Sequence, residues 1–288
     1  IKDEVLAALR ERGGYVSGQE LCDRFSVSRT AIWKAVSKLK EEGYEIDSVP
    51  NRGYCLLTSP DAMTEAEIRS YLHTEKMGKS LVCFADTDST NIQAKLLAEQ
   101  NAPDGTLVCS DQQTKGRGRR GRAWDSPPGE AIYMSLLLRP DIHPEHASML
   151  TLVMGMAVAD AINELMGGES AGIKWPNDVV LKGKKVSGTL TEMSTEMDCI
   201  HYVVIGTGIN VNTQKFPKEL DQATSLRLAA GHNFRRAELI ALCMKYFEKY
   251  YALFERTEDL SLLIDEYNRL LVNRNREVRV LEPGNEYT

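Results

Sequence analysis

The sequence predicts an α+β protein in which a small helical domain with a β-hairpin precedes a larger domain built on a central mixed β-sheet with helices. Two observations lead to this prediction. Three helix patterns and two short extended runs follow one another within residues 1–58. From residue 80 onward, strand patterns alternate with helix patterns, one of them long and apolar on most faces. A length of 288 residues suits two domains of this kind.

Composition and charge narrow the class of protein. Apolar residues make up 42% of the chain, which is enough for a folded core. No apolar run approaches the roughly 20 residues that a membrane-spanning helix needs. The six cysteines are scattered without a C-x-x-C pair, which argues against structural zinc and against a disulfide framework. We therefore expect a cytoplasmic protein with reduced thiols and no membrane partner.

Caps and apolar spacing predict the N-terminal elements. The first helix pattern ends before Gly13-Gly14, and the second begins after Ser17. Ser28 is a suitable N-cap for a third helix that runs to about Glu42. Two extended runs within residues 44–57 then form a hairpin. This order of elements is that of a winged helix-turn-helix, which we assign to residues 1–60.

The third helix carries one basic face. It has basic residues and no acidic residue between Ser28 and Lys40, although the net charge of the whole chain is −6. A small helical module for protein interaction would give the same helix pattern. Because the positive charge is concentrated on one element, we favour DNA binding. The side chains left for a major groove are Arg29, Thr30, Trp33, Lys34 and Ser37.

The second predicted domain, residues 61–272, starts with a short helix over 65–72 and a strand over 80–85. The sequence Asp88-Ser89-Thr90-Asn91 follows this strand. Such residues can cap the next helix, which is their commoner use, or they can bind a ligand. A strand over 106–111 then leads through Gln113 toward a basic loop.

That basic loop, Lys115 to Arg122, reads K-G-R-G-R-R-G-R and is the strongest motif in the chain. Glycine lets the backbone approach a ligand closely, and arginine suits carboxylate and phosphate groups. The loop is therefore interpreted as a mobile segment that closes over an anion. A solvated basic loop and a nucleic-acid patch are the alternatives. Trp124, next to it, is either a surface anchor or a stacking partner for a flat ring.

The remaining elements complete the second domain. A strand over 131–139 precedes a buried helix over 145–166, whose methionines are interpreted as core residues. One strand over 173–181 contains Lys174-Trp175-Pro176-Asn177-Asp178, and a return strand follows over 185–193. Two long helices over 235–256 and 260–272 and a strand over 277–281 end the chain. The charged strand pair is also compatible with a surface hairpin of mixed charge.

A glycine pair follows another predicted strand, residues 200–205, in the sequence Gly206-Thr207-Gly208-Ile209-Asn210. Glycines at a strand end favour close approach of the backbone to a ligand. The helix and the spacing of a dinucleotide-binding fingerprint are missing, so we reject that interpretation.

Taken together, these motifs make the chain similar to the biotin protein ligases, specifically the bifunctional bacterial kind that is also the biotin operon repressor. The resemblance covers about residues 1–281, and the N-terminal winged helix separates the chain from ligase-only members. It implies a class II synthetase-like catalytic domain followed by a small SH3-like β-barrel, of which residues 273–288 are expected to be only the beginning. The resemblance rests on residues 88–91, 116–122, 174–178, Lys185 and 206–210, in that order.

The resemblance implies a two-step reaction. Biotin and ATP, accompanied by Mg²⁺, form biotinyl-5'-AMP, and biotin then passes to a lysine of a carrier protein. The implied partners are the biotin carboxyl carrier protein of acetyl-CoA carboxylase or a related carboxylase, and operator DNA of biotin genes. A homodimer promoted by biotinyl-5'-AMP is also implied.

The resemblance also implies roles for individual residues. Catalysis is expected from Arg119 and Lys185, which offset the repulsion between a carboxylate and an α-phosphate. Biotin is expected to contact Ser89, Thr90, Asn91, Gln113, Arg117, Gly118, Arg119, Trp175, Lys185, Gly188, Gly206 and Gly208. ATP is expected to contact Arg119, Arg122, Trp124, Lys174, Asn177 and Asn210. Mg²⁺ is expected to arrive with ATP near Asp178 and Asn210, without a firm metal site in the protein.

Two other functions stay open from the sequence. A lipoate or octanoate ligase-like enzyme shares the catalytic architecture, although the arginine loop and the K-W-P-N-D run argue against it. A ligand-sensing repressor with an inactive ligase domain would keep the same motifs.

Overall fold

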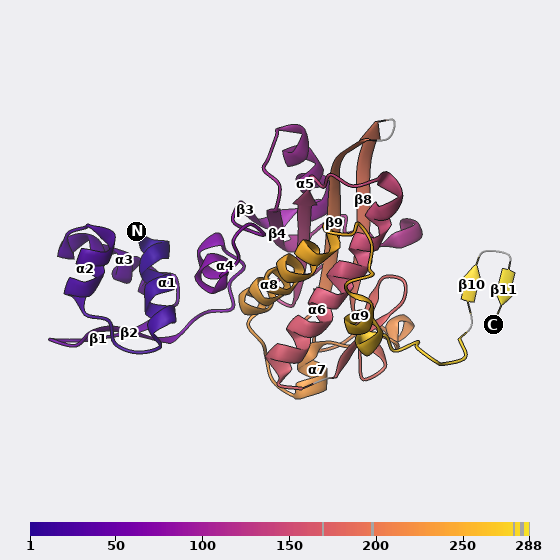
Figure 1. Ribbon diagram of the computed structural model, residues 1–288. Helices are drawn as coiled ribbons and strands as arrows, with labels where there is room; N and C mark the ends of the chain where they lie inside the picture. The colour runs from indigo at the N-terminus through magenta and orange to yellow at the C-terminus, as the bar shows by residue number, and fades with distance from the viewer. Residues whose placement is uncertain (169, 197–198, 279, 283–284, 288) are drawn as a thin grey trace. The chain divides into compact units, whose positions relative to one another are not determined.

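The computed structural model describes residues 1–168, 170–196, 199–278, 280–282 and 285–287, and its fold is α+β as predicted (Figure 1). The chain divides into two compact units. The first contains Ile1–His73 together with Arg235–Ala241. The second contains Thr74–Phe234 and Leu242–Thr288.

The first unit has the predicted winged helix-turn-helix order. Its elements are α1 (Lys2–Arg12), α2 (Gly18–Phe25), α3 (Arg29–Glu41), β1 (Glu45–Val49) and β2 (Gly53–Thr58). The Ser17 and Ser28 side chains cap α2 and α3 by accepting hydrogen bonds from the backbone N–H groups of Glu20 and Ala31. Apolar residues of all three helices and of the hairpin pack into one core.

A further helix, α4 (Glu65–Tyr71), also packs in the first unit, although the predicted boundary at residue 60 assigns it to the second domain. Its buried Glu67 carboxylate lies 2.8 Å from Arg10 Nη2 and accepts a hydrogen bond of 2.6 Å from the Tyr44 hydroxyl. Burial raises the pKa of Glu67, and the bonds from Tyr44 and Arg10 oppose that rise. The sequence pattern of α4 gives no sign of this buried ion pair.

The second unit is built on one seven-stranded mixed sheet, so the predicted central sheet is confirmed. Only β3 and β4 are parallel, and every other neighbouring pair is antiparallel. The strand order is β3 (Leu81–Thr87), β4 (Thr106–Gln113), β5 (Ala131–Leu138), β9 (Cys199–Asn210), β8 (Lys184–Glu196), β7 (Asp178–Leu181) and β6 (Ala171–Lys174).

Helices cover both faces of this sheet. On one face, α5 (Thr90–Glu99) packs on β4, β5 and β9 and extends Asn91 to Glu192 of β8. On the other face, η2 (Pro144–Met149) continues into α6 (Leu150–Met166), where Thr151 contacts Thr191. Neighbouring residues of a strand point to opposite faces of the sheet. Glu192 therefore points toward α5, and Thr191 points toward α6.

Helix α8 (Arg236–Phe254) runs beside α6 in Figure 1. The Tyr250 hydroxyl donates to Asp160 of α6, and Lys245 forms an ion pair of 2.9 Å with Glu164. Arg269, on α9 (Ile264–Leu270), lies 2.8 Å from Asp160. These contacts hold α8 and α9 against α6.

One apolar segment is longer than the sequence analysis expected. Pro144–Met166 has the length and composition of a membrane-spanning helix, so the prediction that no apolar run approaches this length was wrong. Within the protein, 67% of its most apolar window is buried. This agrees with the predicted role of a central core helix.

Two predicted strands differ from those observed. The single strand expected over 173–181 is two antiparallel strands, β6 and β7, because Lys174 pairs with Asp178 and the chain turns between them. The strand expected to stop at residue 205 continues to Asn210, so Gly206 and Gly208 lie within β9. Pro176 lies in the turn between β6 and β7, and the two glycines lie inside a strand and not at its end.

Smaller differences concern the connections and the C-terminal part. The structure adds η3 (Lys218–Leu220) and α7 (Leu226–Ala230) after β9, and α9 is shorter than the second long helix predicted. Strands β10 (Val280–Glu282) and β11 (Asn285–Tyr287) form a separate antiparallel pair. Part of the strand predicted over 277–281 and part of the predicted SH3-like segment 273–288 lie outside the described residues, so that assignment stays a prediction.

Candidate active site

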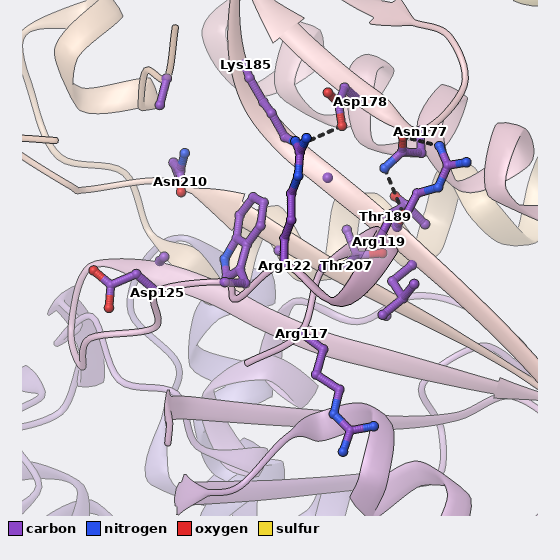
Figure 2. A pocket seen from close by; sticks show the side chains of 18 of the residues that line it. Arg117, Arg119, Arg122, Asp125, Asn177, Asp178, Lys185, Thr189, Thr207 and Asn210 are labelled. Atoms are coloured by element: carbon purple, nitrogen blue, oxygen red, sulfur yellow. Dashed lines mark hydrogen bonds and ion pairs between the residues drawn. The ribbon is translucent and has the colours of Figure 1, made fainter. Parts of the chain in front are cut away.

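A cavity of about 850 Å³ in the second unit brings together every residue that the sequence analysis proposed for ligand binding and catalysis in this domain. Part of it is shown in Figure 2. Its lining includes Ser89, Thr90, Asn91, Gln113, Arg117, Gly118, Arg119, Arg122, Trp124, Lys174, Trp175, Asn177, Asp178, Lys185, Gly188, Gly206, Gly208 and Asn210. These residues come from distant parts of the chain, and the order of the sheet is what makes them neighbours.

The start of α5 gives one part of the cavity neutral polar groups. Ser89 occupies the N-cap position, but its side chain makes no capping hydrogen bond, so the predicted capping use is wrong for this residue. The turn is instead fixed by Asp88, whose carboxylate accepts from the Ser89 N–H at 2.6 Å and from Gln93 Nε2 at 3.0 Å. These bonds lower the pKa of Asp88, chiefly through Gln93, and keep it ionised. The Ser89 hydroxyl is thereby left for the cavity.

Hydrogen bonds hold the side chains beside Ser89 in place. Gln113 Oε1 accepts from the Thr90 backbone N–H at 2.8 Å, and Gln113 Nε2 donates to Ser126 Oγ at 3.0 Å. Ser126 in turn donates to the carbonyl of Trp124 at 2.9 Å. This chain of bonds links α5 and β4 to the segment after the basic loop.

Gly206 creates the space that Asn91 occupies. A Cβ atom at position 206 would fall well inside van der Waals contact with Asn91 Oδ1. Asn91 itself is only 4% exposed, and its amide donates to Glu192 Oε2 at 2.8 Å. The need for glycine therefore comes from a neighbouring side chain, because the Gly206 backbone has no positive φ.

Trp124 covers the next part of the glycine-lined strands. A Cβ atom at Gly208 would lie 2.6 Å from Trp124 Cε2, and one at Gly188 would lie 3.1 Å from Trp124 Cζ3. Lys185 Nζ lies 5.5 Å from the centre of the indole ring, within the range of a cation–π contact. Trp124 is thus packed on the sheet beside a cation, as a wall of the cavity.

The basic loop is folded as a small hairpin with one turn of 3₁₀ helix, η1 (Arg119–Gly121). The Gly118 N–H donates to the carbonyl of Arg122 at 2.7 Å, and the Trp124 N–H donates to the carbonyl of Gly116 at 3.0 Å. Arg119 Nη1 donates to Asn177 Oδ1 at 2.7 Å, and Asn177 Nδ2 donates to the carbonyl of Thr189 at 3.1 Å. We call this Arg119–Asn177–Thr189 chain the loop latch.

The K-W-P-N-D turn between β6 and β7 supplies the partner residues of these cations. Lys185 Nζ lies 2.6 Å from Asp178 Oδ1 on the neighbouring strand (Figure 2). Trp175 is 57% exposed beside them, and its backbone N–H donates to Asn273 Oδ1 at 3.2 Å. Arg117 does not join this group, because Figure 2 shows its guanidinium pointing away from Lys185 and Asp178. The predicted cations therefore lie at two places within one cavity.

Oxygen groups suited to a divalent cation are few at this site. Among the described residues, no group of three or more His, Cys, Asp or Glu side chains could hold a metal ion. Asp178 and Asn210 both line the cavity, but Asp178 is paired with Lys185, and Asn210 Nδ2 donates to the carbonyl of Thr224 at 3.1 Å. One carboxylate and one amide oxygen fit a Mg²⁺ ion that is carried mainly by nucleotide phosphates.

The predicted DNA-contacting residues share the outer face of α3 in the first unit. Ile32, Val36 and Leu39 are buried in the core of that unit, as their spacing predicts. On the other side, Trp33 is 60% exposed, and the Arg29 guanidinium donates to Gln19 Oε1 at 2.9 Å. Arg29, Thr30, Trp33 and Lys34 are exposed, and Ser37 is half-buried.

The sequence analysis missed the residues that support the cavity wall from behind. Ser135 is the one small polar residue in the buried strand A-I-Y-M-S-L-L-L, and a serine among these large apolar and aromatic side chains is the signal that could have identified it. Ser126 and Glu192 carry no such signal, because each lies in a segment already rich in polar residues.

Comparison with known proteins gives consistent matches for both units. Residues 82–210 match the biotin/lipoate A/B protein ligase family, and residues 2–55 match a helix-turn-helix domain family. The chain is 47% identical over 240 residues to the bifunctional ligase/repressor BirA of Bacillus subtilis strain 168, covering 82% of this chain and 74% of that protein. It is 31% identical over 277 residues to BirA of Escherichia coli K12, covering 96% and 84%.

Solved structures give the same match. A biotin protein ligase from Aquifex aeolicus in complex with biotin and ATP aligns with a TM-score of 0.62 and 32% identity. The alignment covers 73% of this chain and 85% of that one.

Proposed function

The chain belongs to the family of bifunctional biotin protein ligase/repressors, and from this premise we propose that it joins biotin to ATP and represses biotin genes. The product of the first step is biotinyl-5'-AMP. In the second step, biotin passes to a lysine of a biotin carboxyl carrier protein of acetyl-CoA carboxylase or a related carboxylase. The winged helix-turn-helix binds operator DNA of the biotin genes.

One observation carries the catalytic part of the proposal: a single cavity combines a neutral polar wall with fixed cations. Ser89, Thr90, Asn91 and Gln113 suit the ureido ring of biotin, which is a neutral donor and acceptor. Arg119 and Lys185 suit two anions that must meet, the biotin carboxylate and the α-phosphate of ATP.

In the adenylation step, a biotin carboxylate oxygen attacks the α-phosphorus while the bond from this phosphorus to the bridging oxygen of pyrophosphate breaks. Lys185 and Arg119 reduce the repulsion between the reacting anions and stabilise the charge that develops on the phosphate. To do so, Lys185 exchanges its contact with Asp178, and Arg119 its contact with Asn177, for contacts with substrate. No covalent bond to the enzyme is needed.

The remaining cavity residues hold the two substrates. Trp175 forms an apolar wall for the thiophane ring and aliphatic chain of biotin. Trp124 stacks on adenine. Arg122, Lys174, Asn177 and Asn210 serve the nucleotide, together with Mg²⁺ carried by ATP, near Asp178 and Asn210.

In the transfer step, the carrier lysine attacks the acyl carbon as a neutral amine, the bond from the acyl carbon to the phosphate oxygen breaks to release AMP, and the amine loses its proton to solvent. The proposal places both reactions in the cytoplasm, where the six cysteines, all free in the structure, remain reduced.

Dimerisation is a further part of the proposal. Strand β8 pairs with β7 only as far as Gly188, so among the described residues its segment 190–196 has no strand on that side. Such an edge can pair with the same edge of a second copy. We expect biotinyl-5'-AMP to favour this dimer, because the arginine loop changes state when the adenylate binds. The dimer then strengthens DNA binding, since it engages two operator half-sites. Sedimentation with and without biotinyl-5'-AMP measures this effect.

The catalytic proposal is tested by incubating the protein with ATP and biotin, lipoate or octanoate and measuring pyrophosphate release. Pyrophosphate release with biotin, and not with lipoate or octanoate, supports the proposal. Faster release with lipoate or octanoate would favour a lipoate ligase-like enzyme. If biotin binds but none of the three acids causes pyrophosphate release, the result would favour a ligand-sensing repressor.

A further inference from the structure

Three side chains behind the cavity wall hold Asn91 in a fixed orientation. Asn91 Nδ2 donates to Glu192 Oε2 at 2.8 Å, and Lys95 Nζ lies 2.6 Å from the other carboxylate oxygen of Glu192. On its opposite side, Asn91 Oδ1 lies 2.6 Å from Ser135 Oγ. Asn91 lines the cavity, whereas Glu192, Lys95 and Ser135 are not among its lining residues.

The charge of Glu192 is the main determinant of which way the Asn91 amide faces, and the carbonyl of Leu190, which accepts a longer bond of 3.4 Å from Asn91 Nδ2, favours the same orientation. An ionised carboxylate only accepts hydrogen bonds, so the NH₂ group of Asn91 must face Glu192. The Asn91 carbonyl oxygen then faces Ser135 and can only accept, which commits the single Ser135 proton to Asn91. Ser135 Oγ is left as an acceptor for its other neighbour, Thr90.

The same argument continues to the cavity surface. Thr90 Oγ1 lies 2.8 Å from Ser135 Oγ and 3.2 Å from Gln113 Oε1. Ser135 can only accept from Thr90, because its one proton is donated to Asn91. Gln113 can also only accept, because it presents its side-chain oxygen to the backbone N–H of Thr90. The Thr90 proton therefore stays within the protein. Toward the cavity, the Thr90 hydroxyl presents only its acceptor lone pairs.

We propose that Glu192, held by Lys95, is a positioning residue that sets the direction of this hydrogen-bond relay, so that the polar wall presents acceptors to a ligand with N–H donors. The inference rests on the proposed function and deepens it, because the ureido ring of biotin carries such donors. An acyl chain without N–H groups, such as octanoate, gains nothing from the relay. Glu192 thereby contributes to the choice of substrate without touching it.

The surroundings of Glu192 keep its carboxylate charged. Burial raises its pKa, but the hydrogen bonds from Lys95 and Asn91 and the nearby charge of Arg117 outweigh that effect, and the pKa lies below its usual value. The relay is therefore set in one direction at neutral pH.

The test compares the wild type with Glu192→Gln, which keeps the shape of the side chain and removes its charge. A glutamine amide can donate or accept, so only the 3.4 Å bond to the Leu190 carbonyl still favours the original orientation of the Asn91 amide, and the relay is less firmly set in one direction. Dissociation constants are measured for biotin and for octanoate, together with KM for ATP and kcat at saturating biotin. We expect the Kd of biotin to rise about tenfold, the upper end of what one neutral hydrogen bond contributes, while the Kd of octanoate, KM for ATP and kcat stay unchanged.

Two further variants separate positioning from a merely structural role. Glu196→Gln changes an exposed carboxylate on the same strand and should leave all four constants unchanged. Lys95→Met removes the cation while the Asn91–Glu192 bond remains, and it should raise the Kd of biotin less than Glu192→Gln does. It also serves as the test if Glu192→Gln fails to fold.

The inference is overturned if Glu192→Gln weakens octanoate and biotin equally, or if neither variant changes the Kd of biotin. A wild-type protein that binds no biotin at all contradicts the proposed function itself, which is a separate outcome.

Discussion

Lys185 and Asp178 form an ion pair of 2.6 Å across neighbouring strands β8 and β7, inside the same cavity as Arg119. If Lys185 leaves this partner to stabilise the reacting phosphate, Lys185→Ala should slow pyrophosphate release about 10²–10³-fold, the usual effect of removing one such donor. Biotin binding should weaken less. Lys184→Ala, at the exposed neighbouring position, is the control. An unchanged rate of release in Lys185→Ala would remove Lys185 from catalysis.

The basic loop should become protected when substrates bind. Arg119, Arg120 and Arg122 are exposed, and like charges repel one another until an anion binds among them. We expect trypsin cleavage within residues 115–122 to slow markedly with biotin and ATP. Cleavage after Arg52, in the exposed turn of the other unit, should not change.

The loop latch gives a second measurement on the same segment. Asn177→Ala removes the acceptor of the 2.7 Å bond from Arg119. Cleavage of the ligand-free protein should then be faster than in the wild type. Equal rates with and without substrates, in both proteins, would contradict loop closure.

Gly208→Ala should disturb the position of Trp124. The added Cβ would lie 2.6 Å from Trp124 Cε2, so the indole must move away from the strand. We expect the free energy of unfolding to fall by about 1–3 kcal/mol, as for other overpacked sites, and ATP affinity to fall as well. Gly168→Ala has no atom within 4 Å of the added Cβ and is the matched control. Unfolding in urea and ATP titration give the two quantities.

The stability of the second unit should depend on Glu248 in a defined pH range. Its carboxylate accepts backbone N–H bonds from Glu75, Lys76 and Met77 at 2.7–2.9 Å. Burial raises the pKa of Glu248, but these bonds outweigh it, and the pKa lies below the ordinary 4.5. The stabilisation is therefore complete above that ordinary value and is lost as pH falls through the lower, folded-state pKa.

Glu248→Gln measures this contribution. At pH 7 it should reduce the free energy of unfolding by about 1–3 kcal/mol, the contribution of partly exposed hydrogen bonds to a charged group. The difference from wild type should be the same at pH 6 and should shrink as the pH falls below 4.5. A difference that grows on acidification would show that the sign is wrong. Urea unfolding at each pH is the measurement.

Exposed residues of α3 should control DNA binding without affecting adenylation. Lys34→Ala should weaken operator binding and reduce the slope of log affinity against log salt by about one, as expected for a phosphate contact. Trp33→Ala should weaken binding to the operator more than binding to random DNA. Pyrophosphate release should stay at the wild-type rate in both, and Lys218→Ala, in the other unit, should change neither activity. Operator binding that is insensitive to both α3 variants would refute the assignment of this helix.

The sequence predicted most of the fold because its signals are local. Ser17 and Ser28 cap their helices, and Gly13 ends α1, each through contacts within a few residues. The errors fall where distant contacts decide. The strand expected over 173–181 is two strands, because the chain turns between Lys174 and Asp178 and β7 runs back along β6. On its other side, β7 pairs with β8. Similarly, α4 joins the first unit because Glu67 meets Arg10 and Tyr44, which lie far away in sequence.

The candidate site was predictable for a different reason. Its charged and glycine-rich motifs are unusual as local sequences, and the sheet brings them all to one cavity. The partners behind them were not predictable. Glu192 and Ser135 are ordinary residues in strands, and only the register of β5, β8 and β9 brings them beside Asn91. The sequence analysis expected both Arg117 and Lys185 to contact biotin. Figure 2 shows that their side chains point to different parts of the cavity, which the sequence alone does not reveal.

The close approach of Asn91 to Gly206 has a consequence for how this site can change in evolution. Any side chain at position 206 collides with the Asn91 amide, while the Gly206 backbone itself would accept another residue. The two positions should therefore covary: a larger residue at 206 is tolerated only with a smaller one at 91. Such an exchange would also release Glu192 and Lys95 from their present partner. Substitutions at these four positions should then be inherited as a set.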